Sequence, residues 1–210
     1  MPIFFQHQIN ETTRLGIWKI EETEEFFKAN VPQHRDVTHP HKRLQHLAGR
    51  FLLQYLFPDF PYELIRIAET RKPFLPEEQY HFSISHCGDY AAAIVSKDRR
   101  VGVDIEIPVD KIIRVRDKFL SPPEVASFGS LDIDQLTMCW SAKEAVFKWD
   151  GEGGVDFREQ IHLQKSTNNT NQINCTFTKG KQVELTIELR HLKYIVLAWT
   201  APDKGVYPLS

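Results

Sequence analysis

The sequence is poor in cysteine and in long apolar runs. It has three cysteines among 210 residues, Cys87, Cys139 and Cys175, and their spacing matches no metal-binding motif. Because three cysteines cannot all pair, the sequence predicts a protein of the reducing cytoplasm rather than a disulfide-stabilised one. No apolar run approaches the ~18 residues that a membrane-spanning helix needs, so we expect no contact with a membrane.

Net charge is also nearly absent. The 26 basic and 28 acidic side chains leave a formal charge of −2, so the molecule as a whole is not a polycation and we expect no nucleic-acid partner. Any phosphate-binding site must come from a local cluster of cations. Hydrophobic residues at 41% and charged residues at 26% are typical of an ordinary globular core.

The stretch Val101–Glu106 predicts a short strand with two carboxylates on one face. Side chains two apart in a strand point the same way, so Asp104 and Glu106 project together and Val103 and Ile105 project oppositely. Two like charges side by side are costly to bury. A hard divalent cation such as Mg²⁺ prefers carboxylate oxygens and would offset that cost.

A second stretch, Trp140–Lys148, has the periodicity of a helix. Its buried face is predicted to consist of Ala142, Ala145, Val146 and Trp149, and its neighbouring side of Trp140, Lys143, Glu144 and Lys148. If this side opposes the strand, Glu144 becomes a third carboxylate for the metal. The two lysines then become cations beside it, an arrangement suited to phosphoryl transfer.

Each motif alone has an ordinary structural explanation. A single D-x-E is common in sheets that have one wet face, and K-E-x-x-x-K on a helix is usually a surface ladder of ion pairs. The combination of the two motifs in one chain carries the functional interpretation.

Five segments in a fixed order resemble one family, the 4′-phosphopantetheinyl transferases of the surfactin-synthetase-activating type. They are R-K-P-F at 71–74, F-S-I-S-H-C-G at 82–88, G-V-D-I-E at 102–106, F-L-S-P-P-E at 119–124 and W-S-A-K-E-A-V-F-K at 140–148. The sequence departs from the family pattern at two positions: Cys87 stands where a small hydroxyl residue is usual, and Arg71 where glycine is usual.

The resemblance implies an α+β fold of two similar halves related by a pseudo-twofold axis, with the active site between them. We expect an N-terminal half at 1–98 and a C-terminal half at 99–210. The implied reaction transfers the 4′-phosphopantetheine arm of coenzyme A to a serine of an apo acyl or peptidyl carrier protein and releases adenosine 3′,5′-bisphosphate. A monomer is expected because one chain supplies both halves.

The resemblance also assigns roles to individual residues. It implies that Asp104, Glu106 and Glu144 hold Mg²⁺, that Lys148 and Lys143 stabilise developing negative charge, and that Glu144 or a metal-bound water takes the serine proton. Coenzyme A is expected to contact Lys72, Ser85, His86, Arg43 and Arg50. For the two arginines, a solvated place on a surface helix is the alternative. Glu124 is either a ligand at the edge of the metal site or a carboxylate that caps its own helix.

Residues 108–120 mix four cations with apolar side chains. This pattern fits either a half-buried basic helix or a docking surface for an acidic helix, and the resemblance to enzymes that act on carrier proteins favours docking. The carrier itself is not specified: fatty-acid, polyketide and nonribosomal peptide pathways all use one.

Two other functions fit parts of the pattern. A metal-dependent nuclease uses similar carboxylate–lysine sites, but the nearly neutral charge argues against it. A non-catalytic nucleotide-binding module would keep the fold and lose motif residues, and here every motif carboxylate and lysine is present.

The periodicity predicts the remaining elements. Strands are expected at 3–9, 14–20, 63–69, 80–85 and 90–96, with 85–88 forming a loop, and helices at 21–30 and from His39 to Leu56. A helix is expected to begin at the N-cap Ser121. Four antiparallel strands are expected at 159–164, 173–178, 182–189 and 193–200.

Overall fold

The computed structural model describes residues 3–32, 36–167 and 169–201. The strands are β1 Ile3–Gln8, β2 Thr13–Lys19, β3 Arg66–Ile67, β4 Pro73–Phe74, β5 His81–Cys87, β6 Tyr90–Ser96, β7 Val103–Glu106, β8 Ile161–Lys165, β9 Gln172–Phe177, β10 Val183–Leu192 and β11 Ile195–Thr200. The helices are α1 Glu24–Asn30, α2 Pro40–Leu56, α3 Lys111–Phe119, α4 Pro122–Phe128, α5 Ile133–Asp150 and α6 Phe157–Gln160, with a 3₁₀ turn at Tyr62–Leu64. Within the described ranges, no helix combines the length and the apolar character needed to cross a membrane.

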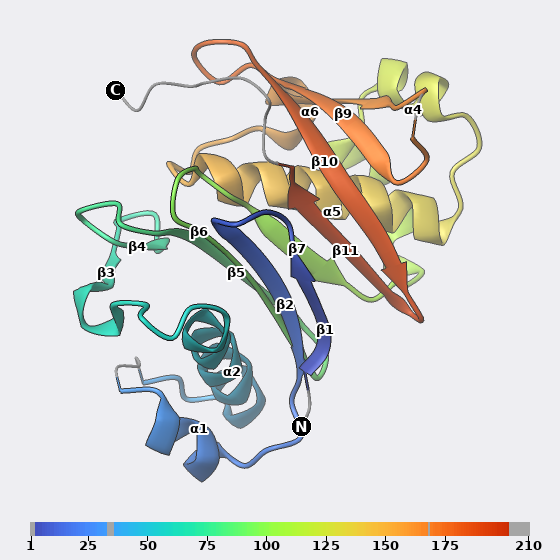
Figure 1. Cartoon of the computed structure of the whole chain (residues 1–210). Coiled ribbons are helices and arrows are strands. Elements are labelled where there is room, and N and C mark those ends of the chain that lie inside the picture. The colour runs from blue at the N-terminus through green and yellow to red at the C-terminus, as the bar shows by residue number, and fades with distance from the viewer. Residues whose placement is uncertain (1–2, 33–35, 168, 202–210) are drawn as a thin grey trace.

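The first sheet is antiparallel, in the order β1-β2-β6-β5. Helix α2 packs against β2, β5 and β6, and α1 packs on α2, so both helices lie on one side of the sheet (Figure 1). The buried stripe of α2 includes Leu47, Leu52 and Leu56 at helical spacing, and it forms a core with the alternate, inward-facing residues of the strands.

The second sheet is also antiparallel, in the order β7-β11-β10-β9-β8, and α5 lies across β7 and β11 (Figure 1). Its core contains the predicted buried face of α5, with Ala142, Ala145 and Val146 fully buried and Trp149 partly buried against them.

A third hydrophobic cluster joins the two sheets. Leu15, Ile17 and Ile94 from the first sheet pack with Val103 and Ile105 from β7. Polar contacts reinforce the junction, since Ser83 and Ser85 of β5 accept hydrogen bonds from the backbone amides of Val103 and Ile105 at 3.2 and 3.3 Å. Strand β7 is therefore held by both sheets, and its two carboxylates face away from the shared core.

The α+β class is confirmed. The described strands of the first sheet end at Ser96 and those of the second begin at Val103, apart from the small β3–β4 hairpin in the N-terminal part. The boundary between residues 98 and 99 and the pseudo-twofold relation of the halves stay predictions.

Two predicted boundaries were wrong. The region 63–69 is not one strand: Tyr62 and Ile65 are both buried three residues apart, which suits a 3₁₀ turn, and only Arg66–Ile67 is extended. Ser85, His86 and Cys87 do not form a loop but extend β5, because they pair with Tyr90–Ala92 and the chain turns at Gly88–Asp89.

Candidate active site

The site is built where β7 meets α5, and a glycine allows this approach. A Cβ at Gly102 would overlap the carbonyl oxygen of Ala145 and meet the amide of Trp149 at 2.7 Å. The Gly102 backbone is also paired with Thr200 of β11, so it cannot move away from the helix. The glycine of the G-V-D-I-E motif therefore sets the distance between the carboxylate strand and the helix that opposes it.

Helix α5 is fixed at both ends by local sequence. Asp132 and Gln135 form a capping box, with Asp132 accepting from the Gln135 amide at 2.8 Å, and Gly151 ends the helix with φ +71°. On this helix Trp140, Glu144 and Lys148 are four residues apart, so they share one face.

Asp104 is the most constrained of the three predicted metal ligands. It is 2% exposed, and its Oδ1 accepts hydrogen bonds from Lys148 Nζ at 2.7 Å and Ser85 Oγ at 2.8 Å. Lys148 Nζ also donates to Ser85 Oγ at 2.8 Å. The other oxygen, Oδ2, is buried and has no hydrogen-bond partner among the residues that the structure describes. A buried carboxylate oxygen without a partner is costly and indicates a place for a cation or water.

Glu106 and Glu144 share the electrostatic environment of Asp104. Burial raises the pKa of Glu106, the charge of Asp104 raises it further, and hydrogen bonds from Cys87 and Trp140 oppose the rise. Burial raises the pKa of Glu144 to about 7, with repulsion from Asp104 adding to it and Lys148 opposing it. The three carboxylates therefore repel one another at neutral pH.

The donor atoms of this trio suit a hard divalent cation. All are carboxylate oxygens, one of them is buried without a partner, and a cation would relieve the mutual repulsion. Among the described residues, however, no three such side chains are gathered into a ready coordination shell. Lys148 instead engages one oxygen of Asp104.

Lys143 does not lie with this cluster, and its predicted catalytic role is corrected. It precedes Glu144 by one residue, which turns it about 100° around the helix. Its side chain is 0% exposed, and Nζ pairs with Glu124 at 2.7 Å and donates to the carbonyls of Phe157 and Ile161. Lys143 thus ties α5 to the α6–β8 segment.

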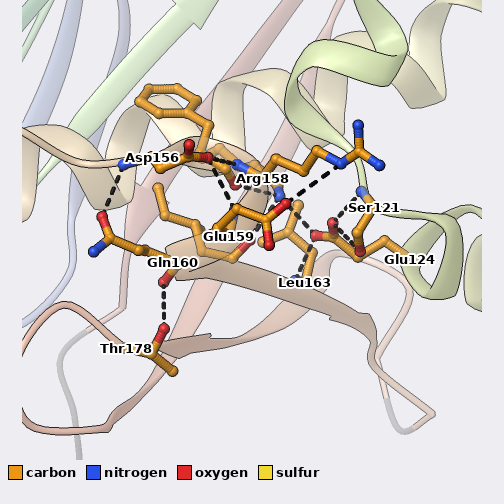
Figure 2. A network of polar contacts seen from close by, with 11 residues as sticks. Ser121, Glu124, Asp156, Arg158, Glu159, Gln160, Leu163 and Thr178 are labelled. Atoms are coloured by element: carbon orange, nitrogen blue, oxygen red, sulfur yellow. Dashed lines mark hydrogen bonds and ion pairs between the residues drawn. The ribbon is translucent and has the colours of Figure 1, made fainter.

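Glu124 is likewise not at the edge of the metal site. Figure 2 shows its carboxylate between Ser121 and Leu163. It accepts from the Ser121 amide and hydroxyl at 2.7 and 2.8 Å and from the Leu163 amide at 2.8 Å. Of the two predicted roles, the capping one fits: Glu124 closes a capping box and partners Lys143.

A pocket of about 200 Å³ lies between the β3–β4 hairpin, β5 and the C-terminal end of α5, and Lys148, which contacts Asp104, connects it with the carboxylates. Its lining includes Lys72, Lys148 and Ser83. Lys72 is half-buried and donates to the Lys148 carbonyl at 2.7 Å, and burial lowers its pKa to about 8. A second pocket, about 280 Å³, shares Lys72 and extends past Arg100.

His86 and the two α2 arginines are placed differently from one another. His86 lies on the exposed side of β5, and partial removal from water lowers its pKa, as do the positive charges of Lys42 and Lys148. Arg43 pairs with Glu24 at 2.8 Å and donates to two backbone carbonyls. Arg50 is buried, 6% exposed. The structure brings Ser85 to the carboxylates, while neither arginine lines the two pockets.

Most residues that line the first pocket were not predicted from the sequence, and Arg71 and Gly151 are two of them. Arg71 was noted only as a departure from the family pattern, yet it lines the pocket, and so does Gly151. A glycine directly after a helical periodicity marks a helix C-terminus, so the position of Gly151 could have been read as the end of α5. No local sequence pattern indicated that the hairpin at 66–74 packs against the C-terminal end of α5.

Helix α3 exposes apolar side chains next to cations. Ile112 and Phe119 form its buried side, while Ile113 on the helix and Val109 just before it are 53% and 55% exposed. The region 108–120 is therefore a half-buried helix with an outer face of mixed apolar and basic character.

Comparison with known proteins identifies the domain that carries this site. Residues 100–200 match the sequence model of the 4′-phosphopantetheinyl transferase superfamily. This part of the chain is similar to that superfamily's domain. The matched range contains both β7 and α5, so the resemblance inferred from the motifs is confirmed at this level, and the surfactin-type subclass stays a prediction.

Individual relatives agree with this assignment. Enterobactin synthase component D of Escherichia coli K12 is 37% identical over 113 residues, 51% of this chain and 54% of the relative. A 4′-phosphopantetheinyl transferase of Escherichia coli O157:H7 is 34% identical over 116 residues, 52% and 59% of the two chains. An L-aminoadipate-semialdehyde dehydrogenase-phosphopantetheinyl transferase of Xenopus laevis is 29% identical over 130 residues, 51% and 43%. The chain spans about half the length of these relatives.

Proposed function

We propose that this protein transfers the 4′-phosphopantetheine arm of coenzyme A to a serine of an apo carrier protein. The observation that carries the proposal is the contact of Lys148 and Asp104, both in the range that matches the phosphopantetheinyl transferase superfamily, with Ser85 of β5, next to a pocket that Lys148 also lines. The relatives that bear the name phosphopantetheinyl transferase support the same reaction class.

Asp104, Glu106 and Glu144 would hold Mg²⁺. When bound, the ion would neutralise charge on the diphosphate of coenzyme A. Lys148, which pairs with the Oδ1 atom of Asp104, also lines the pocket, where its ammonium group can bind a phosphate oxygen.

The reaction exchanges one phosphorus–oxygen bond for another. The carrier serine oxygen bonds to the phosphorus that carries the pantetheine arm, and the bond from that phosphorus to the leaving adenosine 3′,5′-bisphosphate breaks. The serine proton must go to a base, and we assign this role to Glu144 or to a water held beside it. Lys148 stabilises the negative charge that passes to the leaving group.

Other residues would bind the two substrates. We assign the nucleotide half of coenzyme A to Lys72, which lines the pocket, and to His86, which feels the charges of Lys42 and Lys148. The exposed apolar and basic face of α3 suits an acidic helix of the carrier. Because both sheets contribute to the site, we expect the monomer to be active.

The test is the intact mass of apo carrier proteins after incubation with this protein, Mg²⁺ and coenzyme A. We expect one phosphopantetheine to be added per carrier, and the addition to stop when the metal is chelated. Fatty-acid, polyketide and peptidyl carriers are compared in parallel to identify the preferred acceptor. An unchanged mass for every carrier, with coenzyme A bound, would contradict the proposal.

A further inference from the structure

Residues 68–72 form a turn that demands a left-handed residue at position 71. The Arg71 amide donates to the Ala68 carbonyl at 2.8 Å, and the Ala68 amide donates to the Lys72 carbonyl at 2.9 Å. Arg71 has φ +66°. A turn followed by a left-handed residue is the pattern of a glycine bulge, so glycine is the favoured residue here. Arginine at this position costs conformational free energy that glycine would not.

The turn cannot relax, because both neighbours of Arg71 are anchored to the end of α5. Thr70 Oγ1 donates to the Gly151 carbonyl at 3.2 Å, and Lys72 Nζ donates to the Lys148 carbonyl at 2.7 Å. The backbone of Arg71 is therefore fixed at the mouth of the first pocket, and its side chain is part of the pocket wall. An unfavourable backbone conformation at a ligand pocket is a pointer to function.

The charge of the pocket indicates what the side chain does there. Three cations line it, Arg71, Lys72 and Lys148, and no carboxylate does. Lys72 is engaged by a backbone carbonyl and Lys148 by Asp104 and Ser85. Within the described parts of the chain, no hydrogen bond or ion pair joins the guanidinium of Arg71 to another residue. A ligand can therefore bind the guanidinium of Arg71 without displacing a protein group from it.

We propose that Arg71 is a substrate-binding residue whose guanidinium binds a phosphate group of the nucleotide-bearing donor. The proposal rests on the proposed function for the identity of that donor, coenzyme A. A planar guanidinium can donate two parallel hydrogen bonds to a phosphate, which glycine at the same position cannot. The cost in backbone energy is then balanced by affinity for the substrate.

The experiment compares four variants in thermal unfolding and in calorimetric binding of coenzyme A. Arg71→Gly should raise the melting temperature by about 2–4 °C, because the strained conformation is relieved, and should weaken coenzyme A binding about tenfold or more. Arg71→Asn tolerates the left-handed backbone without a charge and should also lose affinity. Arg71→Lys should keep most of it. Arg66→Ala removes a cation from the same hairpin but outside the pocket, and should change neither quantity.

A purely structural role of Arg71 would not make Arg71→Gly more stable and, at the same time, weaker in coenzyme A binding. Binding of 3′-dephospho-coenzyme A distinguishes the phosphate: a loss confined to coenzyme A assigns Arg71 to the 3′-phosphate, and a loss with both ligands assigns it to the diphosphate. Unchanged affinity in both Arg71→Gly and Arg71→Asn would overturn the proposal.

A second ligand, inorganic pyrophosphate, distinguishes failure of the Arg71 proposal from failure of the proposed function. If the wild-type protein does not bind coenzyme A, the proposed function fails, and the comparison is repeated with inorganic pyrophosphate. Pyrophosphate binding that weakens in Arg71→Gly would still support an Arg71-dependent phosphate site. Binding of neither ligand by the wild-type protein would overturn both proposals.

Discussion

At the scale of single residues, the site is defined by charges that are buried at a cost. Asp104 is almost fully buried with one oxygen unpaired, and it raises the pKa of both neighbouring glutamates. Such an arrangement weakens the folded state unless a ligand compensates it. The burial of these carboxylates is better explained by function than by stability.

Replacing Asp104 by asparagine separates the contribution of this carboxylate to function from its contribution to stability. Asp104→Asn keeps the shape and removes the repulsion on Glu106 and Glu144, so the free energy of unfolding should change little while transfer activity falls at least about 100-fold. Urea unfolding and a carrier mass assay measure the two quantities. Glu159→Gln, an exposed carboxylate on α6 that lines neither pocket, is the control and should leave activity unchanged. Normal activity of Asp104→Asn would refute the metal assignment.

Lys72 gives a prediction for pH. Its pKa in the free protein is about 8, below the ordinary 10.5, because the side chain is largely removed from water. A bound phosphate favours the charged amine, so below pH 8 binding of coenzyme A should not depend on Lys72 protonation. Above pH 8 binding must take up a proton, and affinity should fall by up to about tenfold per pH unit.

Calorimetric titrations between pH 7.5 and 9.5 test this, a range in which phosphate monoesters are already fully ionised. Lys72→Arg stays charged throughout and should give a flat profile whatever its absolute affinity. A wild-type profile that is equally flat would show that Lys72 does not titrate against the ligand.

At the scale of elements, the decisive feature is the close approach of β7 to α5. Gly102 permits backbone contact with the helix at Ala145. Glu144 and Lys148, which are four residues apart on α5, therefore both face the strand. The adjacent Lys143, about 100° further around the helix, joins α5 to α4, α6 and β8. One helix thus carries a chemical face and a structural face one residue apart.

Gly102→Ala should therefore disturb both fold and site. The new methyl group overlaps backbone atoms on a helix that cannot rotate aside, so we expect a loss of about 2–3 kcal/mol in the free energy of unfolding. Gly16→Ala is the matched control, because its Cβ would meet leucine methyl groups at 3.2 and 3.3 Å, which can shift. Urea denaturation of both variants compares them, and equal losses would contradict the role of Gly102.

At the scale of the whole molecule, the two sheets share a core. The third cluster takes residues from both halves, and Ser83 and Ser85 of the first sheet bond to the backbone of β7 in the second. The site lies along this junction, so its geometry depends on both halves being folded together.

We therefore expect the protein to unfold in one cooperative transition. Differential scanning calorimetry should give a calorimetric enthalpy equal to the van't Hoff enthalpy, and loss of coenzyme A binding should coincide with it. Two resolved transitions would show that the halves fold independently and that the shared core contributes little.

The sequence by itself determined the local elements and the ligand chemistry. Alternation in β7 and helical spacing in α5 predicted which carboxylates share a face, because these periods are properties of the backbone. It could not determine which side of α5 opposes β7, so Lys143 was placed with Glu144 when a rotation of about 100° separates them. Nor could it show that the hairpin at 66–74 anchors to the end of α5, which creates the pocket. Both depend on long-range packing, since contacts between Gly102 and Ala145 or between Thr70 and Gly151 leave no local pattern in the chain.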